Sequence, residues 1–246
     1  MRPTVIYVSG AFVQDTAWWF HRVDAILAEH GIESRAVNLT SCGPAAPLGD
    51  LHDDANALRE VIAEVDGPII LVGHSYGGQV ITEAGAGEPK VRHLVYVSGP
   101  VEDGVSLADS DYMDKSKIAQ PELLDIREDG TVSEGSQRFK TNVLIQLDEL
   151  ELVRESLRRL TRQSLSVFTQ EPQGCAWKEK PSTYILCLND EEVDVQFQRP
   201  GAERCTTVVE VPTNHFPHLE RPDLVADVLL RVATEIESEV GAGVAG

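Results

Sequence analysis

The run from Ile69 to Gly78 constrains the fold more than any other part of the chain. It reads IILVGHSYGG, an apolar strand that leads through a Gly-x-Ser-x-Gly turn into a helix. A nucleophilic serine at such a turn has a strained backbone, so the residues two positions away on either side must be small. Gly73 and Gly77 meet this requirement. The run predicts a nucleophile at Ser75; a glycine-rich turn with a helix-capping serine is the simpler alternative.

Short apolar, β-branched runs alternate with longer amphipathic segments over much of the chain. This order is typical of βαβ units and predicts an α/β fold with a mainly parallel sheet flanked by helices. A chain of 246 residues with this pattern commonly forms one domain. The expected strands are Thr4–Ser9, Ser34–Leu39, Pro68–Gly73, Val91–Ser98, Ser182–Leu188 and Thr206–Pro212, and the expected helices are Thr16–His30, Leu51–Val65, Tyr76–Ala84 and Pro222–Val240.

The alternation stops after Ser98. The chain is then polar and charged until about Lys180, and it contains one strongly amphipathic stretch, Asp148–Leu165. We interpret this part as a helical lid that lies over the carboxyl edge of the sheet, because it precedes the last two strands. The predicted single domain, residues 1–240, therefore has a core of residues 1–102 and 181–240 and a helical lid of about 103–180. A flexible tail of residues 241–246 is expected after it.

The charge of the chain argues against two classes of partner. A formal net charge of −19 repels nucleic acid and anionic lipid surfaces. No stretch approaches the roughly 20 consecutive apolar residues of a membrane span. We therefore expect a small-molecule substrate and neither a nucleic acid nor a membrane as partner. Whether the chain is a monomer or a homodimer stays open.

The four cysteines are too widely spaced to suggest a metal site. Cys42, Cys175, Cys187 and Cys205 contain no Cys-x-x-Cys pair, so neither a zinc site nor a disulfide framework is indicated. We expect no metal and no cofactor. A reducing cytoplasm is the simplest compartment.

A serine nucleophile requires a base, and the base requires a carboxylate that orients it. His215 lies just beyond the last predicted strand, where the order of elements places the base. His218 is its nearest rival, closer to the final helix. Asp190 ends the preceding strand segment and is the expected acid. Glu102 or Asp103, after the Val91–Ser98 strand, is the alternative acid, because a side chain from that strand end could also reach the base.

These motifs resemble the α/β-hydrolase superfamily, and more narrowly its small lid-bearing branch of plant methyl esterases, hydroxynitrile lyases and bacterial esterase-like proteins. The likeness covers nearly the whole chain. It rests on Ser9-Gly10-Ala11-Phe12 followed by Trp18-Trp19, on Gly73-His74-Ser75-Tyr76-Gly77-Gly78, on Tyr96-Val97-Ser98, on Asn189-Asp190 and on His215-x-Pro217-x-Leu219-Glu220-x-Pro222.

The resemblance implies an oxyanion hole. One donor would be the backbone N–H of Tyr76, and the second would be that of Ala11 or Phe12, with Ala11 slightly favoured. The family usually has histidine before the loop glycine, whereas this chain has Ser9, which changes how the loop is held. Hydroxynitrile lyases carry a lysine after the catalytic histidine, where this chain has Phe216, so cyanohydrin cleavage is not expected.

The leading hypothesis is hydrolysis of a small or medium, largely apolar carboxylic ester or lactone. Two alternatives are a tailoring enzyme for a secondary metabolite, which uses the same triad for acyl transfer or C–C hydrolysis, and a slow-turnover ligand-binding receptor or accessory protein. The residues expected to line the substrate pocket are aromatic: Phe12, Trp18, Tyr76 and Phe216 from the core, with Tyr112, Phe139 or Phe168 from the lid.

Overall fold

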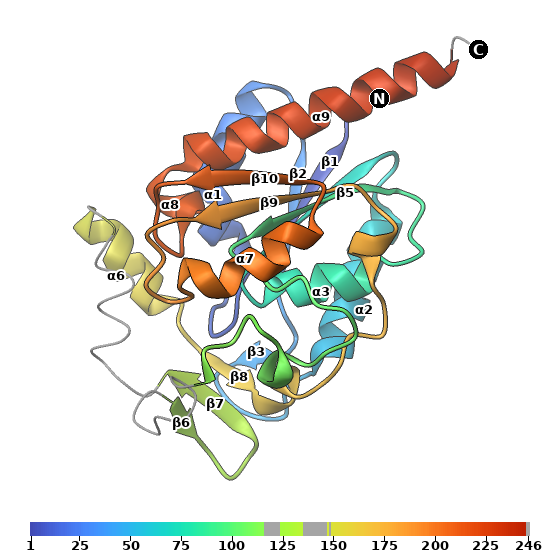
Figure 1. The fold of residues 1–246 in the computed structure, drawn as a ribbon. Helices are drawn as coiled ribbons and strands as arrows, with labels where there is room; N and C mark the ends of the chain where they lie inside the picture. The colour runs from blue at the N-terminus through green and yellow to red at the C-terminus, as the bar shows by residue number, and fades with distance from the viewer. Residues whose placement is uncertain (116–123, 135–146, 148, 245–246) are drawn as a thin grey trace.

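A computed structural model describes residues 1–115, 124–134, 147 and 149–244 (Figure 1). Its centre is a six-stranded sheet in the order β10-β9-β5-β4-β1-β2, and every neighbouring pair is parallel. The predicted α/β class with a mainly parallel sheet is confirmed. The strands are β1 (Thr4–Val8), β2 (Ser34–Val37), β4 (Ile69–His74), β5 (Val91–Val97), β9 (Ser182–Cys187) and β10 (Thr207–Val211), each close to its predicted range.

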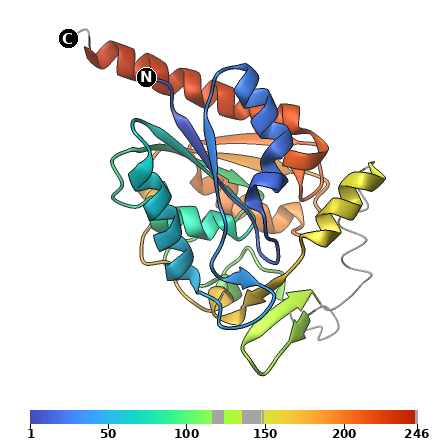
Figure 2. The ribbon, with the colours of Figure 1, turned by 180° about the vertical axis from the view of Figure 1, so that it is seen from behind.

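Helices cover both faces of this sheet (Figures 1 and 2). Alternate strand residues point to opposite faces, so Val5 and Tyr7 join one apolar cluster and Ile6 and Val8 join the other. On the first face lie α1 (Thr16–Glu29), the short α8 (Pro217–Glu220) and the long α9 (Pro222–Val244); on the second lie α2 (Leu51–Glu64), α3 (Gly77–Ala84) and α7 (Val195–Arg204).

The predicted helical lid is only partly helical. One helix, α6 (Leu150–Arg158), lies in the amphipathic stretch but ends before its predicted limit, and Phe139 and Asp148 lie outside the described residues. Three short strands form an antiparallel sheet with a strand that precedes the insertion. The strand order in this second sheet is β3 (Cys42–Gly43), β8 (Arg162–Ser164), β7 (Thr131–Glu134) and β6 (Leu124–Ile126). The described part of the insertion also contains three 3₁₀ turns, η1 (Leu107–Asp109), η2 (Leu165–Phe168) and η3 (Ala176–Lys178).

Polar contacts of a buried arginine explain why the apolar pattern missed this sheet. The Arg162 guanidinium donates to Asp125 Oδ2 over 2.8 Å and to Thr131 Oγ1 over 2.6 Å. Strands of three or four residues that are joined by such contacts have no period-two apolar pattern. The sequence around Arg162 therefore suggested a continuing helix.

The end of one helix and the presence of another also differ from the prediction. Helix α9 continues to Val244, four residues beyond the predicted end at Val240 and into the predicted tail 241–246. Glycine costs about 1 kcal/mol in a helix but does not stop it as proline does. Helix α7 was not predicted, because its Pro200-Gly201 pair argues against a helix. No described helix is both long enough and apolar enough to cross a membrane.

Candidate active site

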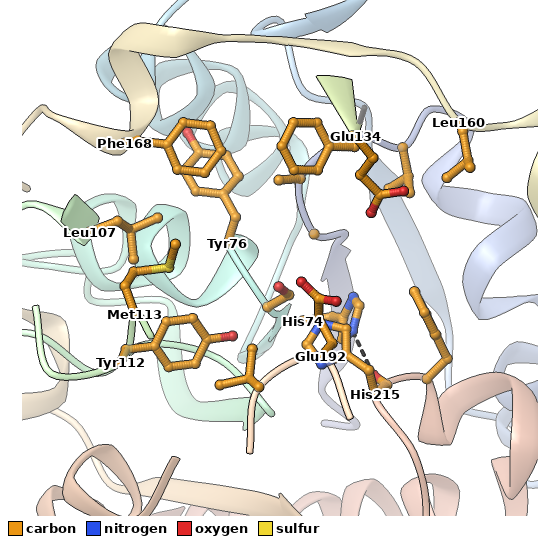
Figure 3. Close-up of a pocket in the computed structure, with 17 residues that line it drawn as sticks. His74, Tyr76, Leu107, Tyr112, Met113, Glu134, Leu160, Phe168, Glu192 and His215 are labelled. Carbon is orange, nitrogen blue, oxygen red and sulfur yellow. Dashed lines mark hydrogen bonds between the residues drawn. The ribbon is translucent and has the colours of Figure 1, made fainter. Parts of the chain in front are cut away.

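The carboxyl ends of five strands meet at one edge of the parallel sheet. Ser75 follows β4, Ser98 follows β5, Asp190 follows β9 and His215 follows β10. The loop after β1 lies at the same edge, and Figure 3 shows the cavity that these segments surround. The structure thus brings the three residues of the predicted triad to one place.

Ser75 occupies the strained turn that its flanking glycines predict. Its φ is 48°, in the left-handed region that non-glycine residues rarely adopt. A Cβ on Gly73 would lie 2.5 Å from the carbonyl oxygen of Gly77, and a Cβ on Gly77 would lie 2.5 Å from that of Val8. A larger residue at position 73 would push the strand end away from the start of α3, and one at position 77 would push the turn away from the end of β1. The Gly-x-Ser-x-Gly pattern is therefore a steric requirement of this turn.

His215 and Asp190 form a close buried pair. The Nδ1 atom of His215 lies 2.7 Å from Asp190 Oδ2. The carbonyl oxygen of His215 accepts a hydrogen bond from His74 Nε2 over 2.8 Å, which fixes the peptide that carries the imidazole. With its Nδ1–H donated to a carboxylate, a neutral His215 presents an unprotonated Nε2, the form that a general base requires.

Asp190 accepts hydrogen bonds on both carboxylate oxygens. Its Oδ1 accepts from the backbone N–H groups of Glu192 and Val193, each over 2.9 Å. Its Oδ2 accepts from Ser98 Oγ over 2.6 Å and from Gln198 Nε2 over 3.0 Å, in addition to His215. Sequence reasoning assigned no role to Ser98 or Gln198, since Gln198 lies in the helix that it missed.

Each member of this pair stabilises the charged form of the other. Burial would raise the pKa of Asp190, but the adjacent His215 and the donated hydrogen bonds lower this pKa below its usual value. Burial would lower the pKa of His215, but the charge of Asp190 and its hydrogen bond raise this pKa above 6.5, and Glu192 and Glu134 add to the effect. Figure 3 shows both of these glutamates beside the same cavity.

The alternative acids lie in other interactions. Glu102 Oε2 is 3.1 Å from Arg204 Nη1, and Asp103 Oδ1 is 2.5 Å from Lys178 Nζ. The structure thus places Asp190, and neither alternative, against His215.

The alternative base, His218, is fully buried away from any described carboxylate partner. Its ring stacks on Phe20 with a centroid distance of 4.5 Å, and it meets the His74 ring edge-on at 4.6 Å. Among the described residues, neither ring nitrogen of His218 has a hydrogen-bond partner. Burial, with the nearby His215, lowers the pKa of His218 to about 3.

The loop after β1 lies directly against the serine. A Cβ on Gly10 would be only 2.9 Å from the Cβ of Ser75. Of the two predicted donors in this loop, Phe12 already donates its N–H to Gln163 Oε1 over 3.1 Å. The prediction of Phe12 as an oxyanion donor does not fit this contact, which sequence could not reveal because the partner is 151 positions away. Ala11 is the candidate that the structure leaves, together with Tyr76 beside Ser75.

The cavity above Ser75 has a volume of about 100 Å³. Tyr112 donates its hydroxyl hydrogen to the carbonyl oxygen of Ser98 over 2.7 Å and lies close to the Ser75 side chain. Phe139, the third aromatic residue expected from the lid, lies outside the described residues. The apolar part of the described lining consists of Ala11, Phe12, Val13, Leu107, Tyr112, Met113, Leu160, Phe168, Val193 and Phe216, and Tyr76 also contributes.

Trp18 was expected in this cavity, and the structure places it elsewhere. It is not among the described residues that line the cavity. Its ring packs edge-on against Trp19, and the Arg159 guanidinium lies over it, 4.2 Å from the ring centroid. Helix periodicity turns Trp18 toward this contact and directs its neighbour Trp19 into the core.

The family model of the alpha/beta hydrolase family matches residues 5–228 of this chain. The chain belongs to the alpha/beta hydrolase family. The match includes the turn around Ser75, the strand end at Asp190 and the segment of His215.

This alpha/beta hydrolase is similar to proteins from fungi, plants and bacteria. It is 27% identical to the alpha/beta hydrolase nvfD of Aspergillus novofumigatus (strain IBT 16806), over 96% of this chain and 98% of that protein. It is 25% identical to methylesterase 8 of Arabidopsis thaliana, over 95% and 90% of the two chains. The structure of a pyrethroid hydrolase from Sphingobium faniae JZ-2 matches with a TM-score of 0.74 at 22% identity, over 94% and 97% of the chains.

A ring exchange at position 218 tests the assignment of the base within this alpha/beta hydrolase. The His218→Phe variant keeps an aromatic ring against Phe20 and removes two ring nitrogens that make no described hydrogen bond. We expect turnover within about threefold of wild type, because the change conserves packing and removes no catalytic proton. Steady-state kinetics of the variant and of wild type measure this, and thermal unfolding of both proteins shows whether the variant is folded. A loss as large as that of His215→Ala would move the base to His218.

Proposed function

We propose that this protein is a serine hydrolase that cleaves a small or medium-sized, largely apolar carboxylic ester or lactone through an acyl-enzyme. The observation that carries the proposal is the 2.7 Å contact between His215 Nδ1 and Asp190 Oδ2, because His215 lines the same cavity as Ser75. The largely apolar lining of that cavity supports an apolar substrate. The similarity to a methylesterase and a pyrethroid hydrolase agrees with ester chemistry.

In the proposed mechanism Ser75 Oγ attacks the substrate carbonyl carbon while His215 Nε2 takes the hydroxyl proton. The backbone N–H groups of Ala11 and Tyr76 stabilise the negative oxygen of the tetrahedral intermediate. His215 then donates its proton to the leaving alcohol, and the acyl group stays on Ser75. A water molecule, activated by His215, releases the acid in a second round of the same steps. Asp190 orients the imidazole throughout.

A series of p-nitrophenyl esters with increasing acyl length tests the substrate class. We expect measurable steady-state turnover with short and medium acyl chains and a decline for long chains, because the described cavity is small. A burst of one equivalent of nitrophenol followed by negligible turnover would favour the receptor alternative. Absence of both burst and turnover with every ester and lactone tested would contradict the proposal.

The raised pKa of His215 predicts the pH dependence of the reaction. The base must be neutral to accept the Ser75 proton, so kcat/KM rises as the pH passes the pKa of His215. Since Asp190, Glu192 and Glu134 raise that pKa, we expect the midpoint of the rise above pH 6.5. Measurement of kcat/KM from pH 5 to 9 checks this. A midpoint below 6.5 would contradict the described electrostatics.

A further inference from the structure

The loop that carries Ala11 is held by polar contacts with distant parts of the chain and with the start of α1. At its beginning the Ser9 hydroxyl contacts Thr16 Oγ1 at 2.8 Å. Phe12, further along the loop, has a φ of 64°, a backbone conformation that residues other than glycine rarely adopt. Such a conformation persists only where surrounding contacts fix it, and the Phe12 N–H has one such contact, Gln163 Oε1.

Gln163 is a fully buried residue on β8, with 0% of its surface exposed. Its Oε1 accepts from the Phe12 N–H over 3.1 Å and from Cys42 Sγ over 2.8 Å. Its Nε2 donates to Ser41 Oγ over 2.5 Å. Because the backbone N–H can only donate, the orientation of this amide is fixed. The second sheet, which the sequence did not predict, therefore reaches the loop beside Ser75 through this side chain. The Thr161 N–H, just before β8, also donates to the Phe12 carbonyl oxygen over 2.7 Å.

The chain of hydrogen bonds continues to Asp54 on α2, which is also 0% exposed. The Ser41 hydroxyl donates to Asp54 Oδ2, and the Ser41 N–H donates to Oδ1 over 2.9 Å. Thr40 Oγ1 donates to Oδ1 over 2.8 Å, and the Tyr76 hydroxyl donates to Oδ2 over 2.8 Å. Four donors thus satisfy a carboxylate that is buried beneath the site. Tyr76 is the residue that follows Ser75.

From this geometry we propose that Asp54 and Gln163 are positioning residues of the oxyanion hole. They form one continuous hydrogen-bonded path, Phe12–Gln163–Ser41–Asp54–Tyr76, whose two ends adjoin the two backbone donors. Neither residue touches the substrate. Gln163 fixes the loop of Ala11, and Asp54 fixes the ring of Tyr76. The inference rests on the proposed serine hydrolase function. It adds that these two side chains fix the distance between the two backbone N–H donors of the oxyanion hole.

Fixed donors matter because an oxyanion hole works by being in place before charge develops. A shift of about 1 Å in such a group can lower a rate about a hundredfold. Substrate binding in the apolar cavity depends less on these donors than the tetrahedral intermediate does. Loosening the path should therefore lower kcat and leave KM nearly unchanged, which a general loss of structure would not do.

The experiment compares Gln163→Leu and Tyr76→Phe with wild type. The probes are phosphonylation of Ser75 by a fluorophosphonate, hydrolysis of p-nitrophenyl butyrate, and inhibition by an alkyl trifluoromethyl ketone, whose adduct carries the oxyanion. For Gln163→Leu we expect the phosphonylation rate and kcat to fall about ten- to a hundredfold. KM should stay within about twofold, and the ketone should bind weaker by the factor lost in kcat/KM. Tyr76→Phe should lower the same three quantities, the phosphonylation rate, kcat and the ketone affinity, by smaller factors.

Glu83→Gln is the matched control. Glu83 is a buried carboxylate on α3, 1% exposed, that accepts from the Gln173 N–H and contacts His52, away from the described cavity. Its change alters a buried hydrogen-bonded side chain, as Gln163→Leu does, but this side chain has no described hydrogen bond to the loop beside Ser75. We expect altered stability with kcat and the phosphonylation rate unchanged.

Several outcomes would overturn the inference. Folded Gln163→Leu with kcat, labelling rate and ketone affinity all within twofold of wild type would do so. A loss of equal size in Glu83→Gln would also do so, since the effect would then be general. If Gln163→Leu does not fold, two other variants decide: the isosteric Gln163→Glu, which faces Ser41 with a second acceptor, and Tyr76→Phe. Values of kcat, labelling rate and ketone affinity within twofold of wild type in these folded variants would then overturn the inference. Wild type that is not phosphonylated at Ser75 would instead refute the proposed function itself.

Discussion

Replacing Ser75 with alanine is expected to lower ester turnover by roughly 10⁵- to 10⁶-fold. The change removes the atom that forms the acyl-enzyme, and no described neighbour can take its place, because the strained turn presents only position 75 between the Gly10 loop and His215. Folding should be little affected, since the hydroxyl is the only group lost. Steady-state kinetics on p-nitrophenyl butyrate, with thermal unfolding of both proteins, check the effect.

The Ser75→Ala result discriminates between mechanisms. Hydrolysis that is retained within tenfold of wild type in the folded variant would mean that water is activated directly, or that another residue is the nucleophile. His215→Ala is the matched variant, because base and nucleophile act as a unit and should show losses of similar size.

Asp190→Asn is expected to lower kcat about 10⁴-fold in a variant that still folds. Its free energy of unfolding should also fall, because an NH₂ in place of Oδ2 cannot accept the hydrogen bond from Gln198 Nε2. The two backbone N–H groups that donate to Oδ1, from Glu192 and Val193, require an oxygen at that position. The new amide NH₂ must then take the place of Oδ2 and face His215 Nδ1. It would favour the imidazole tautomer with hydrogen on Nε2, which cannot accept the Ser75 proton. Kinetics and urea unfolding of the variant measure the two effects.

Glu102→Gln and Asp103→Asn are the controls for the acid. Both carboxylates lie in ion pairs outside the contact with His215, with Arg204 and Lys178 respectively. We expect mild effects on kcat from either change. A crippled Glu102→Gln beside a near-normal Asp190→Asn would place the orienting carboxylate at the end of β5 instead.

The parallel sheet could be predicted from sequence because its strands, apart from the polar edge strand β2, are short runs rich in apolar residues between amphipathic segments. The turn at Ser75 could be predicted for a steric reason, since Gly73 and Gly77 are required by backbone atoms of neighbouring segments. The order of elements then placed Asp190 and His215 at one sheet edge. Such local and topological signals are readable without knowledge of side-chain contacts.

Residues whose place depends on distant polar contacts could not be predicted in this way. Gln163 reaches Phe12 across 151 positions, and Ser98 reaches Asp190 across 92. The short strands around Arg162 are joined by buried polar groups, so an apolar pattern read as a helix there was misleading. Trp18 was assigned to the cavity by its aromatic character, while the turn of α1 directs its ring toward Arg159.

Covalent labelling of Ser75 tests the central claim most directly. The protein is incubated with a fluorophosphonate, and intact mass spectrometry with peptide mapping locates the adduct. We predict one phosphonyl group per chain, attached to Ser75, formed faster as the pH rises through the pKa of His215 and absent from Ser75→Ala. No adduct on a folded wild-type protein, or an adduct on another residue with Ser75 unmodified, would contradict a serine hydrolase mechanism at this site.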